Sequence, residues 1–325
     1  MTTPRALITG ITGQDGSYLA EQLLAAGWEI HALVRAPIDH EPAVVVQGAT
    51  VHLGDLANSS ELPKLVDDIE PDYVFNLGGL SSVARSWVEP VATGHISGIA
   101  VLALLDASWK LQERTGRVVR FVQASSSEIF GDAPRAPQSE KTAIAPISPY
   151  GIAKACAHHA VAMYRAKGLH ASSGILYNHE SPRRPATFVT RKITKGVAEI
   201  AAGMSGGISL GNLDVKRDWG WAPDYVDSLV RMSMASEADD YVIATGESHS
   251  IREFVIAAFS EVGIADWEPF VTIDPRFFRP ADALEMRGDA SKAHSVLGWQ
   301  PTVDFTGIVS RMVAMDVDHI RHSQR

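Results

Sequence analysis

The chain has 325 residues, of which 46% are hydrophobic and 21% charged, and its glycines and prolines are spread along its length. This composition excludes a disordered chain, a collagen-like repeat and a coiled coil, and the length predicts one large domain or a large domain with a smaller dependent lobe. The excess of 38 acidic over 29 basic residues gives a net charge of −9, which disfavours a nucleic-acid partner.

A single cysteine, Cys156, excludes an internal disulfide and a metal cage built from cysteines, and we expect no metal site. No apolar run approaches the ~20 residues that a membrane-spanning helix needs. The first residues lead straight into a folded motif and leave no room for a secretory signal. We therefore expect a cytoplasmic globular protein with no membrane partner.

Short apolar runs alternate with helical patterns through the first half of the chain. Strands are predicted at residues 5–9, 29–34, 49–53, 73–77, 117–123 and 171–177, and helices at 18–26, 59–69, 92–112 and from residue 149. Strands that alternate with helices over short loops form a parallel sheet covered on both faces. The predicted fold class is α/β, with a Rossmann-like doubly wound parallel sheet.

The regular alternation ends after Tyr177. A loop rich in proline and arginine follows at 178–185, then a helix through 192–202 and shorter mixed elements. We predict a nucleotide-binding domain at residues 1–177 and a smaller α/β substrate-binding lobe at 178–325. The stretch near 213–246 is a candidate to rejoin the first domain, because residues 241–245 have the pattern of one more strand.

Three glycines, Gly10, Gly13 and Gly16, lie between the first strand and the first helix. Glycine at these positions permits a tight turn and a close approach to a pyrophosphate, and the helix N-terminus offers unpaired N–H groups. The spacing GxxGxxG also occurs in turns that bind nothing. The strand before it and the amphipathic helix after it favour a dinucleotide site.

The end of the second strand indicates which dinucleotide binds. NAD sites place a carboxylate there for the ribose 2′-hydroxyl, about twenty residues beyond the glycine loop. This chain has Arg35 after Val34 and no acid before Asp39. A guanidinium suits a 2′-phosphate, so NADP is favoured, although a lone arginine is also common as a solvated surface cation. Asp55 is a candidate to hydrogen-bond the adenine amino group.

Tyr150 and Lys154 give the strongest chemical signal in the sequence. Ser148 suits a helix N-cap and Pro149 the first helical position, so Tyr150 and Lys154 are predicted one turn apart on the same helix face. A tyrosine with a pKa of about 10 is a poor base at neutral pH unless a nearby cation stabilises the phenolate. Lys154 and the nicotinamide charge of a bound dinucleotide can supply that field.

Polar residues follow the strand at 117–123, at the end where parallel sheets bind ligands. They are the serines at 125–127 and then Glu128. A carboxylate between Ser127 and the apolar pair Ile129 and Phe130 is expected to be partly desolvated, which raises its pKa and suits it to general acid/base catalysis. The alternatives are an ordinary serine turn and a solvated loop glutamate.

The chain also has six segments with a more specific pattern, at residues 8–21, 123–128, 178–184, 188–194, 211–220 and 274–280. Together they resemble the GDP-mannose 4,6-dehydratase family of the extended short-chain dehydrogenase/reductase superfamily, over nearly the whole chain. The pair Gln14 and Asp15 in the glycine loop and the run Asn178-His-Glu-Ser-Pro-Arg-Arg184 are more specific than superfamily features.

The resemblance implies roles for particular residues. The family's catalytic positions fall on Ser126, Glu128, Tyr150 and Lys154. Its NADP contacts fall on Gly10, Thr12, Gly13, Gln14, Asp15, Gly16, Arg35, Asp55, Leu56, Leu77, Gly78, Gly79, Ser81, Lys154, His179 and Arg184. Its GDP-sugar contacts fall on Ser81, Ser126, Glu128, Tyr150, Asn178, Lys192, Arg217 and Arg279. An acidic protein can bind a diphosphate where such cations gather.

The implied reaction is an internal redox cycle that converts GDP-mannose to the 4-keto-6-deoxy sugar and water. Tyr150, as phenolate, would take the O4 proton while NADP+ accepts hydride from C4, with Ser126 hydrogen-bonded to O4. Glu128 would remove the acidified C5 proton and protonate the departing 6-hydroxyl. Hydride would then return to C6 and a proton to C5.

The chain departs from the family pattern at two places. The segment at 36–42 is shorter and partly acidic, whereas in the family it helps to hold the cofactor phosphate and reaches a neighbouring subunit. The resemblance implies a homo-oligomer, and this segment leaves dimer and tetramer both open. The second departure is Trp221, which replaces a residue that is usually smaller.

Two other functions fit parts of the same pattern. Another nucleotide-sugar epimerase, reductase or dehydratase would use the same scaffold. An epimerase has no need of C5 proton chemistry, so Glu128 beside Ser126 favours dehydration. A non-catalytic NADP-binding protein has no need to keep Tyr150, Lys154 and Glu128 together.

Overall fold

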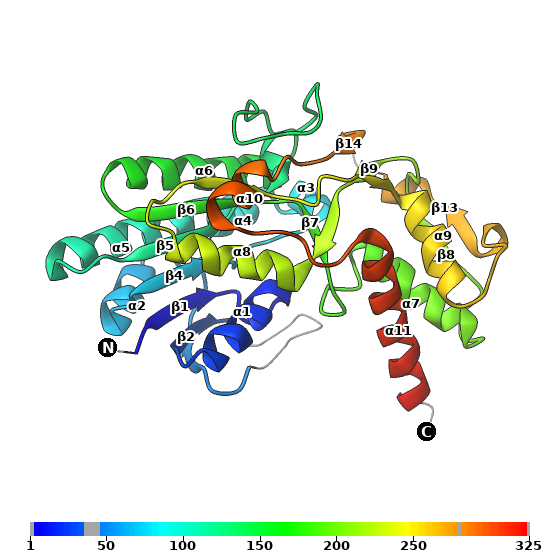
Figure 1. Cartoon of the computed structure of the whole chain (residues 1–325), viewed down its shortest axis with the longest axis horizontal. Helices are drawn as coiled ribbons and strands as arrows, with labels where there is room; N and C mark the ends of the chain where they lie inside the picture. Colours follow the sequence, from blue (N-terminus) through cyan, green and yellow to red (C-terminus); the bar gives the residue numbers. More distant parts are fainter. Residues whose placement is uncertain (1–2, 36–45, 279–280, 324–325) are drawn as a thin grey trace.

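The computed structural model describes residues 3–35, 46–278 and 281–323, and its centre is a seven-stranded sheet with the order β11-β6-β5-β4-β1-β2-β3 (Figure 1). The strands are β1 (Arg5–Thr9), β2 (Glu29–Val34), β3 (Thr50–Leu53), β4 (Tyr73–Asn76), β5 (Arg120–Ala124), β6 (His170–Leu176) and β11 (Asp240–Ile243). All neighbouring strands are parallel. The predicted Rossmann-like sheet is confirmed.

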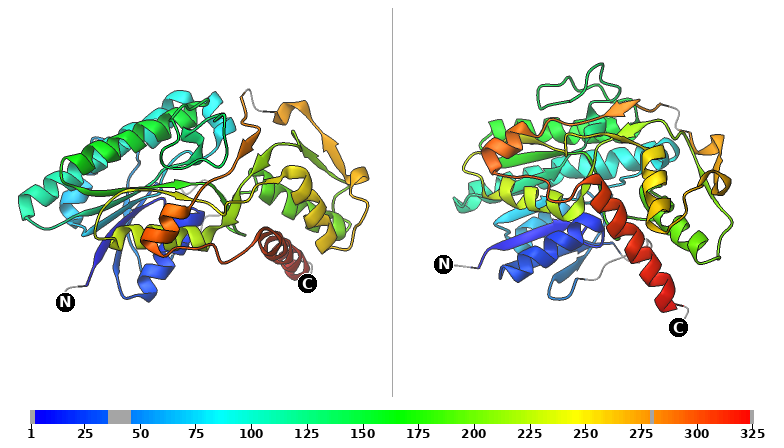
Figure 2. Two further views of the ribbon diagram at one scale, coloured as in Figure 1. Left: turned by 45° about the horizontal axis from the view of Figure 1, so that its top comes forward. Right: turned by 45° about the vertical axis from the view of Figure 1, so that its right-hand side comes forward.

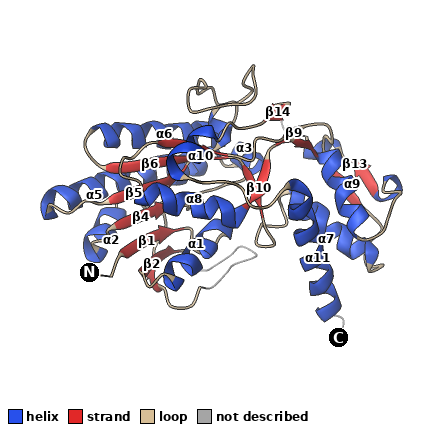
Figure 3. Cartoon of the chain, viewed as in Figure 1, coloured by secondary structure: helices blue, strands red, loops and turns tan. Residues whose placement is uncertain are grey.

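Helices cover both faces of this sheet (Figures 2 and 3). One face holds α1 (Gln14–Ala25), α8 (Ala222–Met234) and α10 (Ser291–Leu297), which share a core with Ile8 and Phe75 of the strands. The other holds α2 (Leu62–Ile69), α5 (Ala100–Thr115) and α6 (Pro149–Ala166), in a core with Leu7 and Phe121. Successive strand residues point into opposite cores, and for this reason the central strands are apolar throughout.

The second lobe lies beyond the carboxyl ends of the strands (Figure 1). Its helices α7 (Val189–Ala201), α9 (Ile251–Glu261) and α11 (Phe305–Ser323) pack around a third hydrophobic core. Short strands complete it: β7 (Asn178–Glu180) pairs with β10 (Trp219–Trp221), β8 (Ile208–Leu210) with β13 (Val271–Ile273), and β9 (Lys216–Arg217) with both β12 (His249–Ser250) and β14 (Glu285–Met286).

The chain returns to the first lobe after it has entered the second. β11 pairs in parallel with β6, so residues 240–243 lie in the main sheet, in agreement with the strand predicted at 241–245. Helices α8 and α10 also pack on that sheet. The residues after Tyr177 therefore contribute one strand and two helices to the first lobe.

The helix predicted at 92–112 is part of a longer helical run. The run consists of α4 (Pro90–Gly94), a π-helical turn (η1, His95–Ile99) and α5, and the unpredicted short helix α3 (Val83–Val88) precedes it. Pro90 suits the first turn of a helix, and Gly116, with φ +66°, ends α5. Among the described residues, the helical run at 90–115 is long and apolar enough to span a membrane by length and composition alone. Half of its most apolar stretch is buried inside the molecule.

Trp221, which the sequence left without an explanation, packs against the first turns of α11 and the residues before it. Its side chain packs against Val303, Ile308 and Met312, and the guanidinium of Arg311 lies 5.2 Å from the centre of its ring. A smaller residue would leave this junction unfilled. The substrate contact predicted at Arg279 and the shortened segment at 36–42 lie outside the described residues.

Candidate active site

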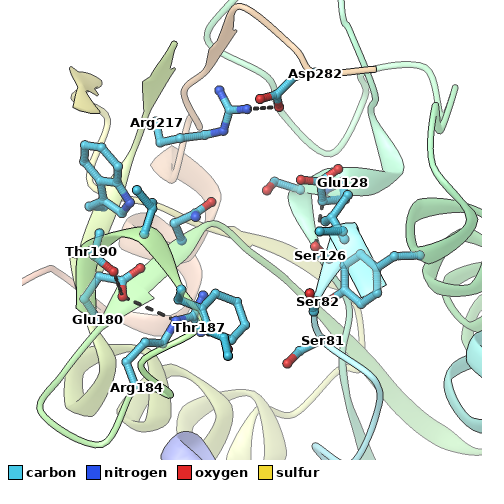
Figure 4. A pocket seen from close by; sticks show the side chains of 18 of the residues that line it. Ser81, Ser82, Ser126, Glu128, Glu180, Arg184, Thr187, Thr190, Arg217 and Asp282 are labelled. Atoms are coloured by element: carbon cyan, nitrogen blue, oxygen red, sulfur yellow. Dashed lines mark hydrogen bonds and ion pairs between the residues drawn. The ribbon is translucent and has the colours of Figure 1, made fainter. Parts of the chain in front are cut away.

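A cavity of about 670 Å³ lies between the carboxyl ends of the sheet and the second lobe. Ser126 and Glu128 face it from the first lobe, and Glu180 and Arg184 face it from the second (Figure 4). Tyr150 and Lys154 line the same cavity. The side chains for which the sequence predicted phenol, ammonium and carboxylate chemistry therefore share one compartment.

Helix α6 positions Tyr150 and Lys154 as its sequence predicts. The Ser148 hydroxyl accepts a hydrogen bond from the Gly151 N–H at 3.0 Å, and Pro149 occupies the first turn. Tyr150 and Lys154 are both buried. Lys154 Nζ donates to the Ala124 carbonyl at 2.8 Å and lies 5.7 Å from the centre of the Tyr150 ring.

Burial shifts the pKa values of both Tyr150 and Lys154. Burial raises the pKa of Tyr150 to about 12, while a hydrogen bond from Ser126 opposes that rise. Burial lowers the pKa of Lys154 to about 8, while the Asp15 carboxylate opposes that fall. In the protein alone Tyr150 is therefore a neutral phenol at pH 7, and its ionisation requires further positive charge in the cavity.

A close contact between two backbones brings Glu128 to Tyr150. Glu128 belongs to a single 3₁₀ turn, η2 (Ser127–Ile129), which Ser126 caps by accepting the Glu128 N–H at 3.2 Å. A Cβ atom at Gly151 would lie 2.6 Å from the Glu128 carbonyl oxygen. Only glycine at 151 lets α6 pack this closely on the turn, and the half-buried Glu128 then lines the cavity beside Tyr150.

The glycine loop has the tight geometry that a dinucleotide site needs. Gly10 has φ +75°, and a Cβ atom there would lie 2.8 Å from the Cα of Gly78. A Cβ atom at Gly16 would clash with the Gly10 carbonyl oxygen. Gly13 directly precedes α1, so the first N–H groups of that helix lie at the loop. The backbone cradle therefore fits a pyrophosphate.

The predicted cofactor residues fall into two groups. One group lines the cavity: Asp15, Leu77, Ser81, Lys154, His179 and Arg184. The other lies at the strand ends outside the cavity lining: Gly10, Thr12, Gly13, Gln14, Gly16, Arg35, Asp55, Leu56, Gly78 and Gly79. Arg35 follows β2 and Asp55 follows the neighbouring β3. This distribution matches an elongated ligand with one end in the cavity.

Two of the predicted substrate cations, Lys192 and Arg217, lie on the second-lobe side of the cavity, and both already have partners. Arg217 forms an ion pair with Asp282 and donates to the Ala283 carbonyl at 2.9 Å. Lys192 Nζ lies 3.6 Å from the centre of the Phe277 ring. Asn178 lines the cavity as well. The positive charge is therefore held in place by acidic and aromatic side chains.

Two carboxylates in this wall were not predicted from the sequence. Glu180 is fully buried, accepts the Thr190 hydroxyl at 2.6 Å and pairs with Arg184 Nε at 3.3 Å. Glu180 lies four residues before Arg184, within the run at 178–184 that the sequence analysis singled out, and this spacing could have predicted the pair. Asp282 lies 65 residues from Arg217 along the chain, and no local pattern predicts their contact.

No group of three histidine, cysteine, aspartate or glutamate side chains within residues 3–35, 46–278 and 281–323 could hold a metal ion.

The chain matches known proteins along most of its length. The family model for GDP-mannose 4,6-dehydratase matches residues 7–312. GDP-mannose 4,6-dehydratase 1 of Arabidopsis thaliana is 44% identical, covering 96% of this chain and 90% of the relative. The human GDP-mannose 4,6-dehydratase is 43% identical, covering 99% and 94%. Among solved structures, the UDP-glucose 4-epimerase of Thermus thermophilus in complex with NAD has a TM-score of 0.83 at 26% identity, covering 98% and 99%. The chain therefore belongs to the GDP-mannose 4,6-dehydratase family.

Proposed function

We propose that this protein is an NADP-dependent GDP-mannose 4,6-dehydratase, which converts GDP-mannose to GDP-4-keto-6-deoxymannose and water. The main support is the convergence of Tyr150, Lys154 and Glu128 on one cavity, in a chain of this family. NADP, when bound, supplies the hydride acceptor for C4 and the hydride donor for C6.

The chain's own residues perform the proton transfers. Tyr150 takes the O4 proton, with Ser126 hydrogen-bonded to the same oxygen and Lys154 contributing positive charge. Glu128 removes the C5 proton, which the C4 ketone has made acidic, and then protonates the leaving 6-hydroxyl. One carboxyl group can do both because the C5 proton it removes is the proton it then delivers. When hydride returns to C6, C5 gains a proton, which balances the proton that Tyr150 took from O4. The raised pKa of Glu128 remains a prediction.

The cofactor assignment follows from the loop and from Arg35. The glycine cradle fits a pyrophosphate, and the exposed Arg35 at the end of β2 suits a 2′-phosphate. The Thermus epimerase with the same fold binds NAD. We propose that the domain at 1–177, with the stretch near 213–246, binds NADP, and that the lobe at 178–325 binds the GDP-sugar through Asn178, Lys192, Arg217 and Arg279.

The decisive experiment is to incubate the purified protein with GDP-mannose and no added reductant. Mass spectrometry should find a product lighter than the substrate by one water, and the product should react as a 4-ketone. UDP-glucose is the control substrate. A change at C4 without loss of water would support an epimerase instead, and turnover that consumes NADPH stoichiometrically would support a reductase.

We also propose that the protein is a cytoplasmic homo-oligomer that needs no membrane or nucleic acid. The net charge of −9 opposes binding to phosphate backbones. Helix α6 exposes Ile152, Cys156 and Met163 on one face, with His159 between them, and we propose this face as the contact between copies. Light scattering should give a multiple of the monomer mass. Ile152→Glu should lower that mass, and an unchanged mass would contradict this interface.

A further inference from the structure

Five hydrogen bonds and ion pairs join the start of α1 to residues 179–183, although the two segments are more than 160 residues apart in the chain. Gln14 Nε2 donates to the His179 carbonyl at 3.1 Å, and Gln14 Oε1 accepts the Ser181 hydroxyl at 2.8 Å. We call this set of contacts the interlobe latch. Its members are Gln14, Asp15, Ser17, Glu21, His179, Ser181 and Arg183.

Arg183 forms the outer part of the latch. Its guanidinium donates to the Ser17 hydroxyl at 3.0 Å and to the Glu21 carboxylate at 2.8 Å, and it lies 3.9 Å from the centre of the Tyr18 ring. Residues 14, 17 and 21 lie on one face of α1 because they are spaced by three and four. That face is turned toward the second lobe.

The inner part of the latch is the contact between Asp15 and His179, which both line the cavity. His179 Nε2 lies 2.9 Å from the Asp15 carboxylate, and Nδ1 lies 2.7 Å from the Tyr177 carbonyl. Both partners are oxygen atoms, so each ring nitrogen of His179 lies within hydrogen-bond distance of an acceptor. Its ring also stacks on Tyr225, with centres 4.5 Å apart.

The pair explains why a carboxylate is present at an anion-binding loop. Burial raises the pKa of Asp15, but the charge of His179 and hydrogen bonds from His179 and Gln14 outweigh it and lower the pKa below its usual value. An ionised carboxylate beside the pyrophosphate cradle would repel a phosphate. The contact with His179 occupies that carboxylate and ties the cradle to the second lobe.

We propose that the interlobe latch controls how fast the dinucleotide leaves, and that Ser17, Glu21, Ser181 and Arg183 are positioning residues for the cofactor. Asp15 belongs to the glycine loop, and Asp15 and His179 line the same cavity as Tyr150, so a dinucleotide that reaches from the glycine cradle to Tyr150 has to pass their contact. This inference rests on the proposed function. A dehydratase restores its cofactor in every turnover, so slow release does not slow the reaction.

The test compares Arg183→Gln and Ser181→Ala with the wild type. Arg252→Gln is the matched control, because Arg252 makes a similar 2.8 Å pair with Asp214 within the second lobe and neither residue lines the cavity. Stopped-flow displacement of fluorescent NADPH should give a dissociation rate about tenfold faster for each latch variant, as expected from the loss of one or two hydrogen bonds. The turnover number at saturating NADP should stay within about twofold, since neither residue contacts the reacting atoms.

The outcomes separate the latch from the proposed function. A melting temperature without cofactor that matches the control, together with faster NADPH release, supports the latch. Arg183→Lys, which keeps the charge opposite Glu21, should recover part of the slow release. An NADPH dissociation rate equal to that of the wild type or of Arg252→Gln would overturn the latch alone. A wild-type protein that binds no NADPH would overturn the proposed function and the latch with it.

Discussion

The two walls of the cavity are built in different ways. The sheet wall, formed by Ser126, Glu128, Tyr150 and Lys154, comes from one strand end and one helix. Backbone groups hold two of its side chains: the Ala124 carbonyl accepts a hydrogen bond from Lys154, and the Glu128 N–H donates to the Ser126 hydroxyl. In the opposite wall, each of Arg184, Lys192 and Arg217 has a side-chain partner, Glu180, Phe277 and Asp282 respectively, and Arg217 also donates to the Ala283 carbonyl.

This difference indicates a division of labour. Side chains fixed by backbone groups keep one geometry, as proton transfer requires. Cations that already face a carboxylate or an aromatic ring can accept a diphosphate as an additional partner without a large change in local charge. Changes in the sheet wall should therefore lower the turnover number, and changes in the opposite wall should raise the KM for GDP-mannose.

The largest effect is expected at the phenol. Tyr150→Phe keeps the ring and removes the group that takes the O4 proton, so turnover should fall ~10²- to 10⁴-fold with the KM little changed. The matched control is Tyr164→Phe, on the same helix, where the hydroxyl binds Asp106 outside the cavity. Steady-state product formation measures both. A Tyr150→Phe enzyme as active as its control would remove the sheet wall from the chemistry.

A similar loss with a different signature is expected at Glu128. Glu128→Gln should stop the release of water, while the absorbance of reduced nicotinamide still appears when GDP-mannose is added, because C4 oxidation does not need this carboxylate. Glu199→Gln on α7 serves as the control. Wild-type rates of water loss in Glu128→Gln would refute its assignment as acid and base.

The opposite wall should respond in binding. Arg217→Gln removes the proposed charged hydrogen bonds to the GDP-sugar, which are worth ~1.5–3 kcal/mol. The KM for GDP-mannose should therefore rise about 10- to 100-fold, while the turnover number changes little. Arg231→Gln, which breaks an exposed ion pair with Asp227, is the control. If Arg217→Gln lowers the turnover number and leaves the KM unchanged, the division between the walls is wrong.

The buried Lys154 of the sheet wall should make the stability of the protein depend on pH. Because burial lowers the pKa of Lys154 to about 8, the unfolded chain binds a proton between pH 8 and pH 10 that the folded chain lacks. The free energy of unfolding of the cofactor-free protein should therefore rise with pH in that window, by about 2 kcal/mol relative to Lys154→Met. Urea denaturation across the window tests this. If the free energy of unfolding changes with pH in the same way in the wild type and in Lys154→Met, the lowered pKa of Lys154 is wrong.

The smallest effect is expected away from both walls. Trp221→Ala should remove the packing against Val303, Ile308 and Met312 and lower the free energy of unfolding by ~1–2 kcal/mol, less than for a fully buried tryptophan. Thermal melting measures it, and the KM should not change. A raised KM with unchanged stability would mean that Trp221 acts on the cavity.

The sequence predicts the sheet wall well because its signals are local. Ser148, Pro149, Tyr150 and Lys154 lie within two helical turns, and the resulting geometry follows from helix spacing alone. The sheet itself follows from alternating strands and helices. The stretch near 213–246, which contains α8, was a candidate to rejoin the first domain, but α10 was not, because its amphipathic pattern does not say which core it faces.

The opposite wall depends on contacts between distant segments. The pairs Arg217–Asp282 and Lys192–Phe277 join residues that are 65 and 85 positions apart, and the latch spans more than 160. The runs that contain Gln14 and His179 were both singled out, but their contact with each other was not predicted, because periodicity carries no information on which loops meet.

The most direct test of the account is an isotope experiment on the intact protein. GDP-mannose deuterated at C4 should give a 4-keto-6-deoxy product with the deuterium at C6, with no reductant added, because the sheet wall holds one substrate through oxidation, water loss and reduction. A product without deuterium at C6, or the recovery of unchanged GDP-mannose, would contradict the internal redox cycle.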